Sequence, residues 1–305
     1  MKILVAGATG VLGRRVIPAL VAAGHDVTGV ARGAAKAQQL RDQGAAPVTV
    51  DLFDAAAVTR AAAGSDAVIN LATAIPPTGR MAWPPAWEET GRLRTEASRN
   101  LVDAALAAGA TRYVQEALGF VYPDRGATWI TEEVALDPPR YARAVRAAEA
   151  EARRFGAGSG TGIALRFGLF YSADSQQTRQ LLSTARRGLL ALPGRGDAYR
   201  PWIHVDDAAS AVVAALDAPG GVYNVVDDHP MTNDEHAGVL GELIGRRLRR
   251  PPTRLAIGPL RLQTRSLRVS NRRLRDATGW HPSYPSLHEG WREILPRLRP
   301  LTTDV

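Results

Sequence analysis

The sequence predicts an α/β protein with a doubly wound parallel sheet and a smaller carboxyl-terminal lobe. Short apolar runs alternate with helical patterns through residues 1–170, and the first run leads directly into a glycine-rich turn. Beyond Phe167 the alternation becomes less regular. Strands that alternate with helices form a parallel sheet covered on both faces. We therefore expect one unit at residues 1–170 and a mixed region at residues 171–305 that completes the sheet and forms the lobe.

The first strand and the turn after it carry the clearest pattern. Residues 3–6, with the sequence ILVA, are typical of a strand buried on both faces, and apolar residues recur at helical spacing from Val16 onward. Gly7, Gly10 and Gly13 lie between them in the motif GATGVLG. Glycines let a backbone approach a pyrophosphate, and a helix start offers it N–H groups and a positive dipole. The turn is predicted to bind the phosphates of a dinucleotide, as in a Rossmann fold.

The second strand, predicted at residues 26–31, leads to Arg32, which is 19 positions after Gly13. An acidic residue at about this distance binds the ribose 2′-hydroxyl of NAD, whereas an arginine favours the 2′-phosphate of NADP. Arg14 and Lys36 are candidates to assist. We predict NADP(H) in preference to NAD(H). The alternative is that Arg32 is a solvated residue at the start of the next helix.

The next two strands are predicted at residues 48–50 and 66–70, and the residues after them would also meet the dinucleotide. Asp51 is a candidate to accept a hydrogen bond from the adenine amino group, although Asp51 or Asp54 could equally be a helix N-cap. Small residues at the end of the second of these strands, Ala72 and Thr73, would let the backbone lie against the cofactor.

A proline-rich stretch at residues 74–87 is predicted to be a loop on the cofactor side of the sheet, where Trp83 and Trp87 would cover an apolar substrate or simply pack. The elements expected after this loop are helices at residues 88–108, 141–155, 178–187, 205–216 and 234–244, and strands at residues 113–115, 162–166 and 222–226.

The composition excludes several classes of protein. There is no cysteine, so disulfides, thiolate metal sites and a cysteine nucleophile are excluded. The net charge of +8 arises with 36 arginines and only two lysines, and no nucleic-acid recognition motif accompanies it. The sequence has neither a signal-peptide pattern nor an apolar run long enough to span a bilayer. We expect a soluble cytoplasmic protein that acts on a small molecule, with no nucleic-acid and no membrane partner.

Motifs along nearly the whole chain occur in a familiar order. They are GATGVLG at residues 7–13, DL at Asp51, NLA at Asn70, NLVDAALAAGATRYV from Asn100, LRFGLFY from Leu165, WIHVDDAA from Trp202, GVYNVVDD from Gly221 and SNRRLRDATGW from Ser270. The sequence resembles the extended short-chain dehydrogenase/reductases, the NAD-dependent epimerase/dehydratase family. The resemblance implies a Rossmann fold and a nicotinamide cofactor. Many relatives form homodimers through helices that correspond to residues 88–108 and 141–155, so a homodimer is possible here, but the sequence does not determine the oligomeric state. Together with the arguments above, it gives the predicted cofactor contacts: Gly7, Thr9, Gly10, Val11, Leu12, Gly13, Arg32, Asp51, Leu52, Leu71, Ala72, Thr73, Phe167 and Leu169.

The chemistry of this family depends on Ser or Thr, Tyr and Lys. Tyr141 matches the family tyrosine, which exchanges a proton with the substrate as hydride moves. The lysine expected four residues later is Val145, and the serine expected four residues before the tyrosine of the VY pair is Leu118. Arg146 is one position away and would point about 100° around the helix. Tyr141 is thus the predicted acid/base in a triad that lacks its Ser and Lys.

Three interpretations remain open. In the first, Tyr141 still acts in an NADP(H)-dependent reduction or epimerisation of a carbonyl or hydroxyl compound. In the second, the site runs a dehydration, cyclisation or isomerisation and keeps the nucleotide as a structural element. In the third, the protein is a non-catalytic NADP(H)-binding sensor or scaffold. Trp83, Trp87, Trp129 and Trp202 around the predicted cleft favour an apolar substrate, with a sugar nucleotide as the commonest alternative in the family.

Other polar and aromatic residues near the predicted cleft have less specific interpretations. In the motif HVDD, Asp206 is predicted to cap a helix rather than to form an acid/base pair or metal site with His204. Glu132 and Glu133 are predicted to be solvated. Tyr122, Asp124 and Trp129 follow the fifth strand on the cofactor side, so each is a candidate to contact the substrate.

Overall fold

The structure is a computed structural model that describes residues 1–76, 80, 83–158, 160–250 and 262–298. At its centre is a seven-stranded sheet with the order β11-β7-β5-β4-β1-β2-β3, in which every pairing is parallel. The doubly wound sheet predicted from the sequence is confirmed. The strands are β1 (Lys2–Ala6), β2 (Asp26–Val30), β3 (Ala46–Val48), β4 (Ala67–Asn70), β5 (Arg112–Leu118), β7 (Thr161–Phe167) and β11 (Gly221–Val225).

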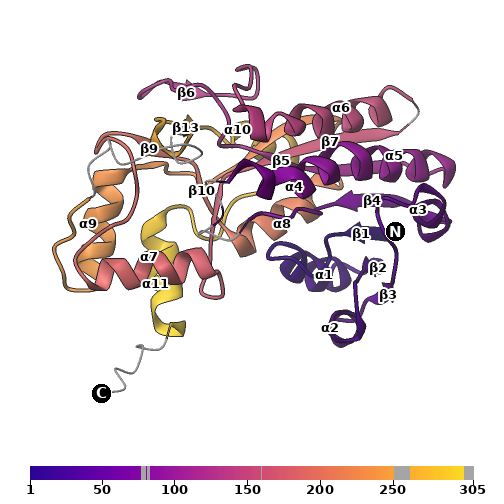
Figure 1. The fold of residues 1–305 in the computed structure, drawn as a ribbon, viewed down its shortest axis with the longest axis horizontal. Coiled ribbons are helices and arrows are strands. Elements are labelled where there is room, and N and C mark those ends of the chain that lie inside the picture. Colours follow the sequence, from indigo (N-terminus) through magenta and orange to yellow (C-terminus); the bar gives the residue numbers. More distant parts are fainter. Residues whose placement is uncertain (77–79, 81–82, 159, 251–261, 299–305) are drawn as a thin grey trace.

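Helices cover both faces of this sheet (Figure 1). In β1, Ile3 and Val5 belong to the core on one face, and Leu4 and Ala6 to the core on the other, because successive side chains of a strand alternate. The run ILVA is therefore buried on both faces, as predicted. The helices of the first core are α1 (Gly13–Ala22), α2 (Ala34–Asp42), α8 (Val205–Ala215) and α10 (Arg272–Thr278), and those of the second are α3 (Ala55–Ala62), α5 (Ser98–Ala107) and α6 (Ala144–Gly156).

A separate group of helices forms the carboxyl-terminal lobe beside the sheet (Figure 1). It consists of α7 (Gln176–Arg186), α9 (Asn233–Leu243) and α11 (Leu287–Arg297), packed around Tyr171, Leu240 and Trp291. Three short two-stranded sheets connect this lobe with the rest of the chain. Their strands are β6 (Trp129–Ile130), β8 (Leu169–Tyr171), β9 (Tyr199–Arg200), β10 (Trp202–His204), β12 (Met231–Thr232) and β13 (Arg268–Val269).

Several predicted boundaries differ from the structure. The strand predicted at residues 48–50 is β3, which ends at Val48 because Val48 is the last residue to pair with β2. Residues 84–87 of the predicted loop form the 3₁₀ helix η2 (Pro84–Trp87), while residues 77–79, 81 and 82 lie outside the described residues. The predicted helix at residues 88–108 is α4 (Glu88–Arg92), the π-helix η3 (Leu93–Ala97) and then α5.

The helix predicted to begin at Tyr141 begins three residues later. Tyr141 lies in the 3₁₀ turn η4 (Arg140–Ala142), and α6 starts at Ala144. Pro138 and Pro139 directly precede this turn, and Pro139 is extended with a ψ of 164°, so helical structure does not extend to residues before Arg140. In the described part of the chain, no helix is both long and apolar enough to cross a membrane.

Candidate active site

The glycine turn brings two backbone segments into contact at the carboxyl end of β1. Gly7 has a φ of +77°, and a Cβ placed on it would lie 2.5 Å from the carbonyl carbon of Leu71. A Cβ on Gly13 would lie 2.2 Å from the carbonyl oxygen of Gly7. Real Cβ atoms do not approach other atoms this closely, so both positions require glycine. The turn therefore presents a surface of backbone, over which a pyrophosphate can approach.

Helix α1 begins at this turn without a side-chain cap. Its N-cap residue is Leu12, and its first turn holds no acidic side chain. The first N–H groups of a helix lack partners within the helix, and together with the helix dipole they favour an anion. Thr9, Gly10 and Val11 lie on the accessible side of the turn, whereas Leu12 is buried. These residues fit the diphosphate of a nicotinamide dinucleotide.

Arg32 lies just after β2, and its side chain is 77% exposed. Its closest carboxylate partner is Glu89, at 3.9 Å. Arg14, which was predicted to assist Arg32, pairs with Asp174 at 3.4 Å instead, and Lys36 is exposed on α2. Arg32 is therefore the cation at the strand end where a 2′-phosphate is expected.

The acidic residues after β3 have separate roles. Asp54 is the N-cap of α3, because it accepts a hydrogen bond from the N–H of Ala57 at 3.0 Å. Asp51 accepts from the N–H of Phe53 at 3.0 Å and stays exposed. Asp54 is thus the helix cap, while Asp51 remains a candidate for the adenine. The other predicted contacts near the strand ends are Leu52, Leu71, Ala72, Thr73, Phe167 and Leu169, of which Thr73 is the most exposed.

Leu118 and Val145 belong to one group of apolar side chains. Leu118 ends β5 and is 6% exposed, and Val145 in the first turn of α6 is 0% exposed. Tyr141 packs against this group and stays partly exposed. The positions at which the family resemblance predicts Ser and Lys are therefore filled by apolar packing. The buried members of the group, here called the Leu118 cluster, are Ala117, Leu118, Val121, Tyr122, Ile130, Leu136, Ala142, Val145, Val226, Leu262, Leu267 and Val269.

Tyr141 lies beside Trp87, with the two ring centroids 5.0 Å apart. Burial raises the pKa of Tyr141 to about 12, and the positive charge of Arg265 opposes this increase. The phenol therefore keeps its proton at neutral pH. In this state it can donate a hydrogen bond to a substrate oxygen, but it is a poor base.

A buried ion pair near the end of β5 was not predicted from the sequence. Arg94, in the π-helix η3, donates from Nη2 to both carboxylate oxygens of Glu116, at 2.9 and 3.1 Å. The two side chains are only 2% and 9% exposed. A π-turn changes which side chains face the sheet, so the period of an α-helix does not indicate that Arg94 is buried.

A second buried network fixes the segment after β5. Arg166 on β7 donates to both carboxylate oxygens of Glu149, at 2.7 and 2.8 Å, and to the hydroxyl of Tyr122 at 2.7 Å. Tyr122 in turn donates to the side chain of Asn224. Glu132 accepts from the backbone N–H of Asn224 at 2.7 Å, and burial raises the pKa of Glu132. The prediction that Glu132 is solvated is therefore wrong, because its carboxylate pairs a backbone N–H of β11.

The N-cap of α8 is His204, so the prediction that Asp206 caps this helix is wrong. The His204 ring accepts from the backbone N–H of Asp206 at 3.3 Å. The Asp206 carboxylate is paired with Arg15 of α1 at 2.8 Å instead. Burial lowers the pKa of His204, although neighbouring carboxylates oppose this decrease. Within the described ranges, no group of three or more His, Asp or Glu side chains is arranged to hold a metal ion.

The four tryptophans predicted around the cleft have different surroundings. Trp87 lies next to Tyr141, whereas Trp83 and Trp129 are 52% and 45% exposed. Trp202 packs in the lobe, edge-on to Tyr171 with ring centroids 6.1 Å apart. Trp87 is thus the tryptophan next to the predicted catalytic tyrosine.

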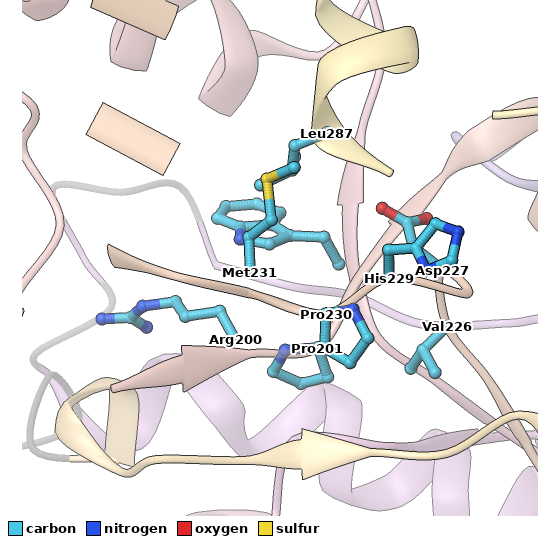
Figure 2. Close-up of a pocket in the computed structure, with 9 residues that line it drawn as sticks. Arg200, Pro201, Val226, Asp227, His229, Pro230, Met231 and Leu287 are labelled. Carbon is cyan, nitrogen blue, oxygen red and sulfur yellow. The ribbon is translucent and has the colours of Figure 1, made fainter. Parts of the chain in front are cut away.

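Trp202 also lines a shallow hollow. Arg200, Met231 and Leu287 lie around it (Figure 2), and it leaves no enclosed room for a water molecule. Val226 lines it as well and belongs to the Leu118 cluster. The hollow therefore borders the Leu118 cluster at Val226.

The comparison with known families agrees with this arrangement. A model of the NAD dependent epimerase/dehydratase family matches residues 3–225. The chain belongs to this family. The family resemblance inferred from the sequence motifs is thereby confirmed, together with the Rossmann-like fold.

Relatives of this epimerase/dehydratase-family protein include reductases. A 3-diazoavenalumate denitrifying reductase from a Streptomyces species is 35% identical, over 97% of this chain and 100% of that protein. A 2-alkyl-3-oxoalkanoate reductase from Stenotrophomonas maltophilia is 28% identical, over 80% of this chain and 76% of that protein. The crystal structure of human epimerase family protein SDR39U1 (isoform 2) with NADPH has a TM-score of 0.81 and 26% identity, over 97% of this chain and 99% of that one. The protein is accordingly an NAD(P)-dependent enzyme of the reductase/epimerase type.

Proposed function

We propose that the protein is an NADP(H)-dependent reductase that delivers hydride to a small, largely apolar acceptor without the lysine-assisted proton transfer of its family. The observation that carries this proposal is the burial of Leu118 and Val145, 6% and 0% exposed, at the positions that correspond to the family serine and lysine. An apolar side chain neither orients a substrate oxygen nor lowers the pKa of a neighbouring phenol. Hydride transfer to an acceptor that needs little help from an acid suits such a site.

The state of Tyr141 favours reduction over oxidation. Its pKa of about 12 means that the phenol is protonated at neutral pH. Such a group can donate a proton to an oxygen that gains charge during reduction, but it does not readily remove one from an alcohol. Epimerisation that begins with proton removal is disfavoured for the same reason. Tyr141 therefore acts as the acid for acceptors that take up a proton.

The cofactor is expected to be NADPH. The glycine turn and the uncapped start of α1 would hold the diphosphate, and the exposed Arg32 would meet the 2′-phosphate. When bound, the nicotinamide supplies the hydride. The human relative whose structure contains NADPH supports this choice.

The names of the two reductase relatives suggest two classes of acceptor. In the reductive removal of a diazonium group, R–N₂⁺ and NADPH give R–H, N₂ and NADP⁺. The C–N bond breaks, its electron pair leaves with N₂, and no proton is taken up. A ketone, as in a 3-oxoalkanoate, requires a proton on oxygen as well as hydride on carbon. The aryl diazonium is our first candidate, because the relative with the higher identity is a denitrifying reductase and the site lacks two of the three acid/base residues.

The test is to follow NADPH consumption with an arenediazonium salt and with a 3-oxo ester. Wild-type protein and Tyr141→Phe are compared, and reactions without protein give the chemical background of the diazonium salt. We expect Tyr141→Phe to retain diazonium reduction and to lose ketone reduction by about 10²-fold or more, the range typical of a general acid. Binding of NADPH without its oxidation by either acceptor would overturn the proposal and favour a structural nucleotide or a sensor.

A further inference from the structure

A segment near the carboxyl end of the chain closes the Leu118 cluster. Leu262, Leu267 and Val269 belong to the cluster, against which Tyr141 packs. Strand β13, which contains Val269, pairs with β6. Residues far from Tyr141 in sequence therefore form part of its surroundings.

Arg265 in this segment connects two other segments of the site. Its Nη1 donates to the carbonyl oxygens of Tyr122 and Asp137, at 2.7 and 2.8 Å, and its Nη2 donates to Oδ2 of Asp137 at 2.8 Å. Tyr122 follows β5, and Asp137 lies four residues before Tyr141. The guanidinium thus joins the segment after β5 to the segment that carries Tyr141.

Other arginines near this region are bound elsewhere. Arg146, the neighbour of the missing lysine position, donates to the carbonyl oxygen of Leu136 at 2.7 Å. Arg166 is held by the carboxylate of Glu149. The charge of Arg265, in contrast, acts on the phenol of Tyr141 and lowers its pKa against the larger effect of burial.

The carboxylate of Asp137 does not fully cancel the positive charge of Arg265, because the two side chains differ in exposure to water. The Asp137 side chain is 63% exposed, whereas that of Arg265 is 23% exposed. Water screens an exposed carboxylate more strongly than a half-buried cation. The guanidinium is therefore the less screened member of the pair, in agreement with the lowering effect of its charge on the pKa of Tyr141.

From this geometry we propose that Arg265 is the positioning residue of Tyr141, and that it provides the fixed positive charge which the family places on a lysine of α6. The inference rests on the proposed function, because it concerns the proton donor of that reaction. Its distinctive feature is that the charge reaches the site from the carboxyl-terminal segment, not from the helix that follows the tyrosine.

Three variants separate a role of the charge from a role in holding the segments together. Arg265→Gln removes the charge, Arg265→Lys keeps it with fewer hydrogen bonds, and Asp137→Asn removes the carboxylate but leaves Arg265 charged. The matched control is Arg272→Gln, since the Arg272 side chain is 84% exposed on α10. The readouts are kcat and KM for ketone reduction, kcat for diazonium reduction, and the melting temperature.

For Arg265→Gln we expect kcat for the ketone to fall by up to about tenfold for each unit by which the pKa of the proton donor rises, with KM and diazonium reduction within about twofold of wild type. Arg265→Lys should restore most of the lost kcat, and Asp137→Asn and Arg272→Gln should not reduce it. An unchanged kcat in Arg265→Gln, or an equal loss in Arg265→Gln, Arg265→Lys and Asp137→Asn, would overturn the inference.

A second measurement decides the inference without any turnover. Fluorotyrosine is more acidic than tyrosine, and its incorporation brings phenol titration into a milder pH range. The ¹⁹F signal of residue 141, assigned by its loss in Tyr141→Phe, should titrate at higher pH in Arg265→Gln than in wild type, and should return toward wild type in Arg265→Lys. If wild-type protein reduces neither acceptor, the proposed function fails, but an unshifted midpoint alone contradicts the role of Arg265.

Discussion

Val145→Lys would return the family lysine to its expected position, but inside the Leu118 cluster. Val145 is 0% exposed there. Burial in apolar surroundings lowers the pKa of a lysine by about 3–5 units. At 1.36 kcal/mol per unit, the loss in the free energy of unfolding at pH 7 is about 4–5 kcal/mol, because a lysine that is neutral in the folded state costs no more than its deprotonation from a normal pKa of about 10.4. Because a typical domain has a total of only about 5–15 kcal/mol, the variant should be close to unfolding at neutral pH.

Denaturant unfolding measures this loss, with Val145→Met as the matched control. Methionine is apolar and nearly as long as lysine. Val145→Met should therefore lower the free energy of unfolding only by the cost of overpacking, about 1–3 kcal/mol. The difference between the two variants isolates the cost of the charge, and it should shrink as the pH rises toward the normal lysine pKa of about 10.4. If Val145→Lys is as stable as Val145→Met at pH 7, position 145 reaches water or a polar site. The argument that apolar packing at position 145 is incompatible with the family lysine would then be refuted.

Three further outcomes are expected. Arg32→Glu should weaken NADPH binding about 10- to 100-fold in a fluorescence titration, through loss of a charged hydrogen bond, and NADH binding much less; equal losses would exclude a contact with the 2′-phosphate. Glu149→Gln should lower the free energy of unfolding by about 3–5 kcal/mol in denaturant, because it leaves Arg166 buried without its carboxylate, and a loss below 1 kcal/mol would count against that pair. Burial lowers the pKa of His236 from 6.5 to about 3, so the folded state binds fewer protons between these values and loses stability as the pH falls from about 6.5 to about 3. His236→Gln should flatten this part of the stability profile, and an unchanged slope would contradict it.

The sequence was sufficient for the fold because its local and long-range signals agree. The ILVA strand, the glycine turn and the alternation of strands with helices all favour a parallel sheet, and the structure has that sheet. The wrongly predicted end of β3 is set by pairing with a neighbouring strand and not by the local sequence. β3 ends at Val48 because β2 ends opposite it, and the apolar residues after it do not extend the strand.

The site was predicted less completely, for physical reasons. The glycines and Arg32 could be proposed from local patterns, and Tyr141 from the family resemblance, and their roles stay predictions. The Arg94–Glu116 pair spans 22 residues and depends on a π-turn, and no local pattern indicates that a charged residue there is buried. Asp206 was predicted to be the helix cap because Asp is a preferred cap residue. Its carboxylate instead pairs with Arg15, which is 191 residues away in the sequence, and no local pattern indicates such a contact.

The position of β11 along the chain, after the first lobe helix, has a practical consequence for protein engineering. The chain leaves the sheet after β7, builds α7 and the strands β8 to β10, and returns through α8 to supply β11 beside β7 before α9 and α11 are made. A chimera joined once at residue 170 would therefore pair β7 of one parent with β11 of the other, and would cover the sheet with the α8 of the other parent. Exchanging α7, α9 and α11 between relatives while residues 205–225 stay with the first parent requires three junctions: before α7, before residue 205 and after residue 225.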